Sequence, residues 1–196
     1  IYISHRGNLN GKNPHKENSP EYIMDALKGG YEVEVDIWYI NEFYLGHDKP
    51  TYKLDFNFFI DYLDKIWFHC KNIEALEKMR NSSLIYFWHD VDSHTMVMNR
   101  NDYIWTFPGI NISKGCICVL PEMTAHSKDK LSSCSGLCSD YIENYKFHPY
   151  AFEIASMVRT GVMSRKEGYD KIYGKEENDS LIIAAKTRLN ILNLKK

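Results

Sequence analysis

The chain has 196 residues, 44% of them hydrophobic and 14% aromatic, which is enough to fill the core of one sizeable domain and excludes wholesale disorder. The formal net charge is −2 and the lysines are scattered, so we expect no nucleic-acid partner and no binding to acidic membranes. No apolar run has the length of a membrane span, and we expect none.

The five cysteines predict buried free thiols, with a structural zinc site as the alternative. They are Cys70, Cys116, Cys118, Cys134 and Cys138. Cys134 and Cys138 have the spacing of half a metal site, but the other pair lacks zinc-site spacing. The odd count and the lack of an apolar signal segment at the start predict a reducing, cytoplasmic location.

The first predicted elements are a strand and a helix. Residues 1–4 are apolar and β-branched, and this strand stops at His5. Ser19 can cap a helix that has Pro20 in its first turn, and Gly29-Gly30 would end it. Apolar side chains recur at helical spacing between these signals, at Tyr22, Ile23, Ala26 and Leu27.

Residues 31–40 alternate strictly, with Glu32, Glu34 and Asp36 on one face of a predicted strand. On a surface strand this acidic face would point to water. Inside a barrel it would point to the axis, where paired carboxylates require a compensating cation. The period alone does not choose between the two, but the nearby His5 and His47 favour the barrel.

The later segments predict an α/β fold. We expect strands at 43–45, 66–71, 84–88, 103–107, 117–120 and 137–140, and a helix at 56–63. The alternation of strands and helices in the first half predicts a parallel sheet with right-handed crossovers. We therefore expect a compact, reduced or irregular TIM-type (β/α) barrel over residues 1–144. A complete barrel needs about 250 residues, so its second half must be reduced.

Residues 145–196 predict a helical C-terminal extension. Helical patterns cover 151–159, 164–173 and 180–194, and Ser164 with Glu167 forms a capping box for the second. We expect this extension to pack on the barrel or to form the interface of a homo-oligomer.

Chemically active residues gather in the first quarter of the chain, at or just beyond predicted strand ends. His5 and Arg6 follow the first strand, Glu34 and Asp36 lie in the second, and His47 follows the third. In a metal-assisted phosphodiester cleavage, carboxylates hold a divalent cation, an arginine neutralises phosphate charge, and histidines move protons. Parallel-barrel enzymes carry their chemistry at this edge of the sheet.

Four short motifs carry a family resemblance: His5-Arg6-Gly7, Glu17-Asn18-Ser19, Glu34-Val35-Asp36 and Gly46-His47-Asp48. In this order and spacing they resemble the amino-terminal signature of the glycerophosphodiester phosphodiesterases, which belong to the superfamily of phosphatidylinositol-specific phospholipase C. The resemblance covers residues 1 to about 72. Weaker similarity extends to Ser139-Asp140-Tyr141, which is similar to the family's closing strand.

The resemblance implies a role for each matching residue. His5 and His47 would be the acid–base pair, and Arg6 would bind the substrate phosphate unless it only pairs with Glu17. Glu34 and Asp36 would ligate one divalent metal, with Mg²⁺ or Ca²⁺ favoured by their hard oxygens. The remaining family positions are Lys71, expected to contact the phosphate, and Glu17, Asn18 and Asp48, expected to support the site.

The third strand departs from the family pattern. The family places a third carboxylate two residues before a lysine, and here His69 precedes Lys71. His69 could ligate as a neutral imidazole, which would shift the preference toward Mn²⁺ or Zn²⁺. Alternatively, Asp90, Glu122 or Asp140 completes the site, or the metal site has decayed.

The function implied by these residues is hydrolysis of a small-molecule phosphodiester like the glycerophosphodiesters. A histidine would take a proton from a substrate hydroxyl or from water, and the other would protonate the leaving alkoxide. The alternatives are an inactive protein that binds phosphates or sugar phosphates, and a lyase that releases a cyclic phosphate. Aromatic residues between 67 and 107 either pack in the core or line a pocket for the alcohol group.

Overall fold

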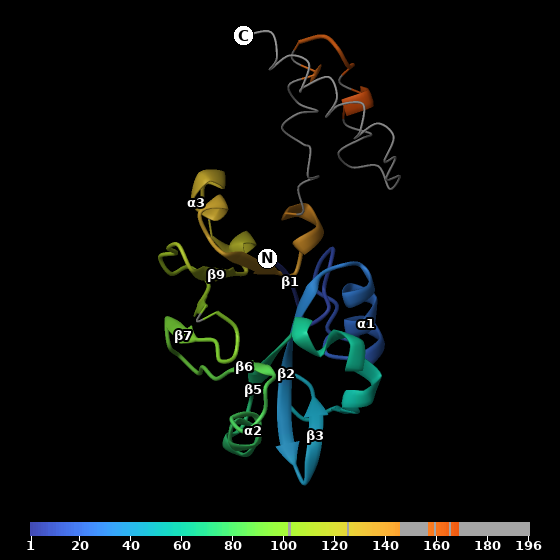
Figure 1. Cartoon of the computed structure of the whole chain (residues 1–196), viewed down its shortest axis with the longest axis vertical. Coiled ribbons are helices and arrows are strands. Elements are labelled where there is room, and N and C mark those ends of the chain that lie inside the picture. The colour runs from blue at the N-terminus through green and yellow to red at the C-terminus, as the bar shows by residue number, and fades with distance from the viewer. Residues whose placement is uncertain (102, 125, 146–156, 159, 165, 169–196) are drawn as a thin grey trace. The chain divides into compact units, whose positions relative to one another are not determined.

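The computed structural model describes residues 1–145 except 102 and 125, together with residues 157–158, 160–164 and 166–168 (Figure 1). Contacts divide the chain into two compact units, residues 1–145 and residues 146–196. In the second unit the predicted capping box is confirmed, because the Ser164 amide donates to Glu167 Oε2 at 2.9 Å and the Glu167 amide donates to Ser164 Oγ at 3.2 Å. The rest of the predicted C-terminal helices, and any oligomer interface on them, lies outside the described residues.

The first unit is built on one mixed sheet. Its strands are β1 (Tyr2–His5), β2 (Glu32–Ile40), β3 (Glu42–Leu45), β4 (Tyr52–Lys53), β5 (Ile66–Cys70), β6 (Ile85–Phe87), β7 (His94–Met96), β8 (Ile104–Thr106), β9 (Cys116–Val119) and β10 (Gly136–Ser139). Eight of them follow the order β6-β5-β2-β1-β10-β9-β8-β7, and every neighbouring pair in this run is parallel except β7 with β8. The hairpin of β3 and β4 continues antiparallel from the far half of β2.

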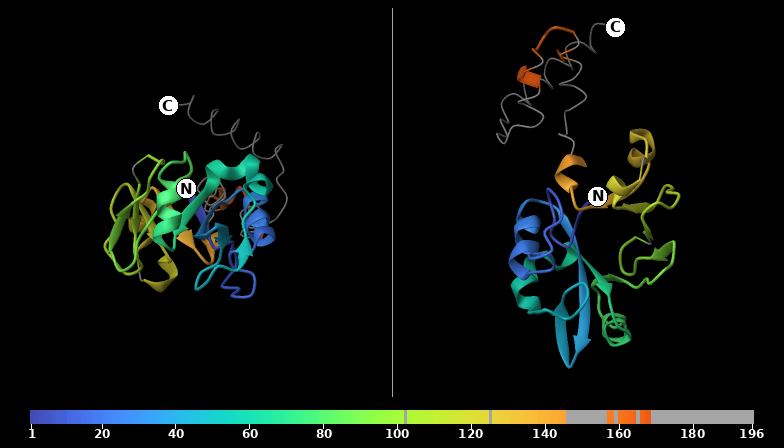
Figure 2. Two further views of the ribbon diagram at one scale, coloured as in Figure 1. Left: turned by 90° about the horizontal axis from the view of Figure 1, so that it is seen from below. Right: turned by 180° about the vertical axis from the view of Figure 1, so that it is seen from behind.

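The sheet curls into a half-barrel with few helices, so the predicted TIM-type (β/α) barrel is wrong (Figures 1 and 2). Regular helices cross between parallel neighbours only as α1 (Pro20–Lys28), α2 (Ile73–Met79) and the short α3 (Lys128–Ser132) within the described part of the chain. The connection from β4 to β5 carries a 3₁₀ helix at Phe56–Lys65, and β3–β4 and β7–β8 form hairpins. With about 145 residues, the unit lacks the length for eight βα repeats.

Helices cover the outer face of β2 and β5. Ile23, Ala26 and Leu27 of α1 and Ala75 and Met79 of α2 share one buried cluster with the outward-facing side chains of these strands. The predicted helix at 56–63 is a 3₁₀ helix, η1 (Phe56–Lys65), and it adds Phe59 to the same cluster. Two further 3₁₀ turns, η2 (Pro121–Met123) and η3 (Ile142–Tyr145), follow β9 and β10.

The inner face of the curl is apolar at its middle and polar at both ends. Ile3, Phe87, Trp105 and Ile117 are buried at the middle of this face. At the amino-terminal end, Glu32 accepts hydrogen bonds from Trp67 and Arg100. The Arg100 guanidinium also makes a cation–π contact with the Trp67 ring. Most of the aromatic run is therefore core. The carboxyl-terminal end of the strands carries the candidate site.

Two predictions about composition can be compared directly with the fold. All five cysteines are free thiols, four of them buried and Cys134 half-buried. Among the described residues, the helices fall short of the length and apolar character needed to cross a membrane.

Candidate metal-binding and acid–base site

Strand register brings the candidate residues from β1, β2 and β5 side by side. His5 is the register partner of Glu34, and Asp36 is the register partner of His69. Because parallel strands share the same direction, all four residues lie at the same end of the sheet on the inner face of the curl. Each is buried, with at most 7% of its surface exposed. The acidic face of β2 therefore points inward, where it lies beside two imidazoles.

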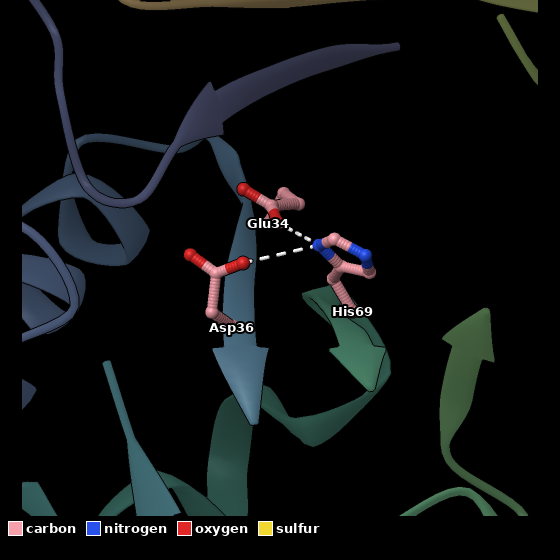
Figure 3. Close-up of side chains that lie close together, drawn as sticks. All are labelled: Glu34, Asp36 and His69. Atoms are coloured by element: carbon pink, nitrogen blue, oxygen red, sulfur yellow. Dashed lines mark hydrogen bonds and ion pairs between the residues drawn. The ribbon is translucent and has the colours of Figure 1, made fainter. Parts of the chain in front are cut away.

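Glu34, Asp36 and His69 form a group that could hold a metal ion (Figure 3). Each offers one ligand atom, and these atoms lie within 4.8 Å of one another. His69 Nδ1 is 3.0 Å from Asp36 Oδ1 and 3.8 Å from Glu34 Oε1. Two carboxylates and one imidazole are a donor set that divalent cations accept.

The His69 ring is fixed on both sides. Its Nε2 lies 3.3 Å from the carbonyl oxygen of His89, which can only accept a hydrogen bond. The ring is parallel to Phe87 and to His89, with centroid distances of 5.0 and 4.4 Å. The pKa of His89 is lowered to about 4 by its burial and by the neighbouring positive groups His69 and Lys71. His89 was given no role by the sequence, because its contact with His69 depends on the pairing of β5 with β6.

Asp36 is the most heavily compensated charge of the site. Arg6 Nε lies 2.9 Å from Asp36 Oδ2, and Lys71 Nζ lies 3.5 Å from Asp36 Oδ1. Asn18 donates to Asp36 Oδ2 and accepts from the Asp36 backbone amide, both at 2.9 Å. Burial alone would raise the pKa of Asp36, but the hydrogen bond with His69 and the charges of Arg6 and Lys71 hold it far below its usual range. Asp36 is therefore ionised whenever the protein is folded near neutral pH.

Glu34, in contrast to Asp36, has few groups that compensate its charge. Burial and the nearby charge of Asp36 raise the pKa of Glu34 above its usual range. Its Oε2 is buried and has no hydrogen-bond partner among the described residues, and His5 Nε2 lies 3.8 Å from it. A buried carboxylate oxygen with no donor is costly. A divalent cation would satisfy this oxygen, so the residues present fit such an ion.

His5 is oriented by a carboxylate that lies 135 residues further along the chain. Its Nδ1 lies 2.7 Å from Oδ1 of Asp140, which directly follows β10, the parallel neighbour of β1. Asn8 donates to the same oxygen at 2.9 Å. Burial would raise the pKa of Asp140, but the hydrogen bond with His5 outweighs it and lowers the pKa. Asp140, one of the alternative metal ligands, thus holds His5 and leaves Nε2 facing Glu34.

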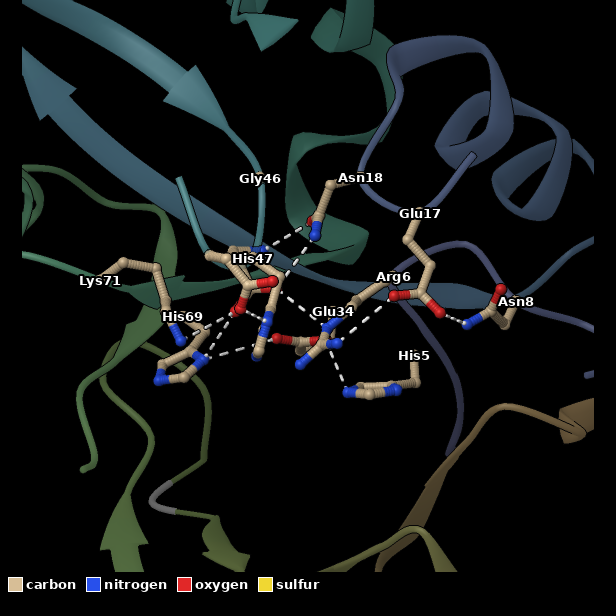
Figure 4. Close-up of polar contacts among 12 residues, drawn as sticks. His5, Arg6, Asn8, Glu17, Asn18, Glu34, Gly46, His47, His69 and Lys71 are labelled. Carbon is tan, nitrogen blue, oxygen red and sulfur yellow. Dashed lines mark hydrogen bonds and ion pairs between the residues drawn. The ribbon is translucent and has the colours of Figure 1, made fainter. Parts of the chain in front are cut away.

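Arg6 lies where β1 turns into the first loop (Figure 4). Its φ of 55° is in the left-handed region, and Gly7 follows with a φ of 91°. A Cβ on Gly7 would lie 2.8 Å from Cδ1 of Tyr22, so the turn requires glycine. Arg6 also pairs with Glu17 at 3.4 Å, and Glu17 accepts from Asn8 at 2.9 Å. Glu17 therefore supports the loop, while Arg6 lies against Asp36 of the candidate metal site.

His47 and Asp48 lie at the rim. His47 is 42% exposed, and its Nδ1 pairs with Asp48 at 2.6 Å. Its turn is attached to β2, because the Gly46 amide donates to the Asp36 carbonyl at 3.1 Å and Trp38 Nε1 donates to the Gly46 carbonyl at 2.6 Å. Partial burial and the charge of Arg6 lower the pKa of His47, so its imidazole is neutral at neutral pH.

The other alternative ligands lie outside the cluster. Glu122 accepts from Ser139 Oγ at 2.8 Å and from the Asp140 amide at 2.9 Å, and thereby secures the end of β10. Asp90 is exposed. Of the three alternatives to His69, none is in the metal-ligand group found among the described residues.

None of the three comparisons with known proteins finds a match. They cover models of protein families, curated proteins and solved structures. The functional argument therefore rests on the residues and their geometry.

Proposed function

We propose that this protein is a metal-dependent phosphodiesterase that cleaves a small phosphodiester next to a free hydroxyl group, as in the glycerophosphodiesters. The observation that carries the proposal is the position of His5. This imidazole is held by Asp140 on one side and presents Nε2 to the buried carboxylate of Glu34 on the other. An oriented imidazole beside a candidate cation site is the arrangement that acid–base cleavage of a phosphodiester needs.

In this proposal the charged side chains bind the phosphate. Arg6 and Lys71 both lie against Asp36, with side chains 18% and 20% exposed, so each keeps part of its surface toward solvent. The Arg6 guanidinium is held through Nε and one terminal nitrogen, which fixes its plane at the edge of the cluster. A cation held by Glu34, Asp36 and His69 would supply further positive charge and polarise the phosphorus.

The histidines move protons. Because Nδ1 of His5 is bonded to Asp140, Nε2 is the atom that exchanges a proton with the substrate. His47 is neutral and accessible at the rim, where it can serve the other side of the phosphorus. One imidazole takes the proton of the attacking hydroxyl or water, and the other protonates the leaving alkoxide. Attack by a neighbouring hydroxyl would give a cyclic phosphate that water then opens.

The substrate in this proposal is a small molecule.

The proposed location is a reducing compartment such as the cytoplasm, which the five free cysteines, four of them buried, support.

The proposal is tested by turnover of glycerophosphodiesters and of bis-p-nitrophenyl phosphate with Mg²⁺, Ca²⁺, Mn²⁺, Zn²⁺ or EDTA. We expect metal-dependent hydrolysis that falls at least about a hundredfold in His5→Ala and in Glu34→Ala. His94→Ala is the matched control, because His94 is exposed on β7 and its ring lies 3.3 Å from the Asn111 carbonyl, outside the site. Circular dichroism would verify that each variant is folded.

Absence of turnover with every metal, in a folded protein that still binds a phosphodiester, would favour the inactive binding protein instead. Phosphorus NMR of the product separates the remaining alternative. An accumulating cyclic phosphate would identify a lyase, whereas an open monoester supports the hydrolase.

A further inference from the structure

The orientation of His69 determines which of its nitrogens can ligate. Nε2 faces the carbonyl oxygen of His89 at 3.3 Å, and a carbonyl only accepts, so Nε2 carries the hydrogen. When a metal ion replaces the hydrogen bond between Nδ1 and Asp36, Nδ1 presents its lone pair to the ion. Metal-bound histidines generally donate a hydrogen bond from their second ring nitrogen to a carbonyl or carboxylate in this way. The ring is therefore held in the form that ligates through Nδ1.

Nδ1 faces both carboxylates, and without a metal ion it is hydrogen-bonded to one of them, Asp36. Nδ1 is 3.0 Å from Asp36 Oδ1 and 3.8 Å from Glu34 Oε1. Two ligands bound to one ion at about 2.0–2.2 Å lie roughly 3 Å apart, which matches the separation of Nδ1 and Asp36 Oδ1. Independently, the Glu34 carboxylate is buried with an acceptor atom, Oε2, that has no hydrogen-bond partner in the described chain, so Glu34 has acceptor capacity left for a cation.

We propose that the Glu34–Asp36–His69 cluster selects a late first-row transition-metal ion, of the Zn²⁺ type, over Mg²⁺ and Ca²⁺. This inference rests on the proposed function, in which the cluster is the cation site, and it specifies the class of cation. Imidazole nitrogen suits Zn²⁺, Cu²⁺, Fe²⁺ and Ni²⁺, whereas Mg²⁺ and Ca²⁺ prefer sites made only of oxygen. His69 is the selecting residue because it supplies the only nitrogen of the three-residue group found in the described chain.

His89 is a positioning residue in this proposal. Its ring lies parallel to His69 at a centroid distance of 4.4 Å and an interplanar angle of 3°, and its carbonyl binds Nε2. Phe87 is parallel to His69 as well, at 5.0 Å. These contacts prevent the imidazole from rotating away from the carboxylates, so that Nδ1 stays aimed at Asp36.

The test measures metal binding by the full chain in the absence of substrate, so that it does not depend on turnover. Zn²⁺, Co²⁺, Mg²⁺ and Ca²⁺ would be titrated calorimetrically into metal-free wild type, His69→Glu and His94→Glu. The first variant restores an oxygen-only ligand set, and the second makes the same change at an exposed histidine on β7. We expect the Zn²⁺-to-Mg²⁺ affinity ratio to fall at least about tenfold in His69→Glu alone.

Two spectroscopic readouts identify the ligands. In ¹⁵N NMR of histidine-labelled protein, one Nδ1 signal should shift on addition of Zn²⁺, and His69→Glu should remove that signal. Co²⁺ should give weak visible d–d bands, whereas an intense near-ultraviolet band would reveal binding to cysteine thiolates. His89→Ala should weaken Zn²⁺ binding severalfold with no effect on Ca²⁺.

The proposal is overturned if wild type binds Mg²⁺ or Ca²⁺ as tightly as Zn²⁺, or if His69→Glu leaves the affinity ratio unchanged. It is equally overturned if the bound Co²⁺ shows thiolate ligation. Loss of phosphodiesterase activity in a protein that keeps this selectivity would refute the proposed function alone.

Discussion

Asn18 holds Asp36 through both its backbone and its side chain. The Asn18 amide group accepts from the Asp36 backbone N–H and donates to Asp36 Oδ2, each at 2.9 Å, across 18 residues of sequence. Asn18 has a φ of 61°, in the left-handed region where asparagine is better tolerated than most residues. The loop that follows Arg6 is thereby fastened to β2 at the cluster itself, so changes in this loop or in the cluster affect each other.

We expect Glu34 to lower the stability of the metal-free protein while being required for turnover. In metal-free protein at neutral pH, Glu34→Gln should raise the free energy of unfolding by about 1 kcal/mol, because it removes a buried charge beside Asp36 that has no hydrogen-bond donor on Oε2. The same change should abolish metal-dependent turnover. Urea unfolding in EDTA measures the first effect.

Glu32→Gln is the matched control, two residues earlier on the same face of β2. Glu32 is paired with Arg100 at 2.6 Å and with Trp67 at 2.6 Å. Its neutralisation should lower the free energy of unfolding by about 1–2 kcal/mol. Equal effects at both positions would show that the two carboxylates do not differ in compensation.

Asp140→Asn should slow catalysis through His5. The variant keeps the side-chain volume but weakens the 2.7 Å contact that orients the imidazole. We expect kcat to fall by about 10- to 100-fold with a smaller change in KM. A proportional rise in KM with constant kcat would instead assign Asp140 to substrate binding.

The same pair predicts how stability depends on pH. The folded pKa of Asp140 is lowered from its usual value of about 3.9. The stabilisation from ionised Asp140 is therefore fully present above that value and is lost as the pH falls through the folded pKa. The difference in unfolding free energy between wild type and Asp140→Asn should be constant from pH 7 to 5 and shrink below pH 4. Urea unfolding at each pH measures it, and a difference that grows in acid would contradict the sign.

Gly7→Ala should destabilise the turn that presents Arg6. The φ of 91° is strained for alanine, and the new Cβ would lie 2.8 Å from Tyr22. We expect a loss of about 2–3 kcal/mol in thermal or urea unfolding. Gly30→Ala is the control, because Gly30 has a φ of 82° but open space around it, and should cost only about 1 kcal/mol.

Local patterns predicted the strands well because each depends on neighbouring residues. The alternation of residues 31–40 became β2, and the segment between Ser19 and Gly29-Gly30 became α1, although the Ser19 side chain makes no capping hydrogen bond. The short strands β4 and β7 and the helices α2 and α3 were missed. Residues 94–96 are His-Thr-Met, which lack the apolar alternation of a strand, and their strand forms by pairing with β8.

Long-range relationships were the least predictable part. The TIM-type barrel was inferred from the βα alternation of the first half, and the later residues do not repeat it. The pairing of His5 with Asp140 spans 135 residues and depends on β10 lying beside β1. The stacking of His69 on His89 likewise requires the register of β5 and β6. Periodicity contains no information about such neighbours.

Asp36 connects the buried cluster to the rim by way of its own peptide unit. Its carboxylate faces His69 and Arg6, while its carbonyl oxygen binds the Gly46 amide at the base of the turn that carries His47. A Cβ on Gly46 would clash with the carbonyl oxygen of Lys49, so this turn has little freedom to adjust. Any shift of Asp36 on cation binding would therefore also move the turn that carries His47. The position of the exposed acid–base histidine would then depend on whether the buried cluster holds a cation.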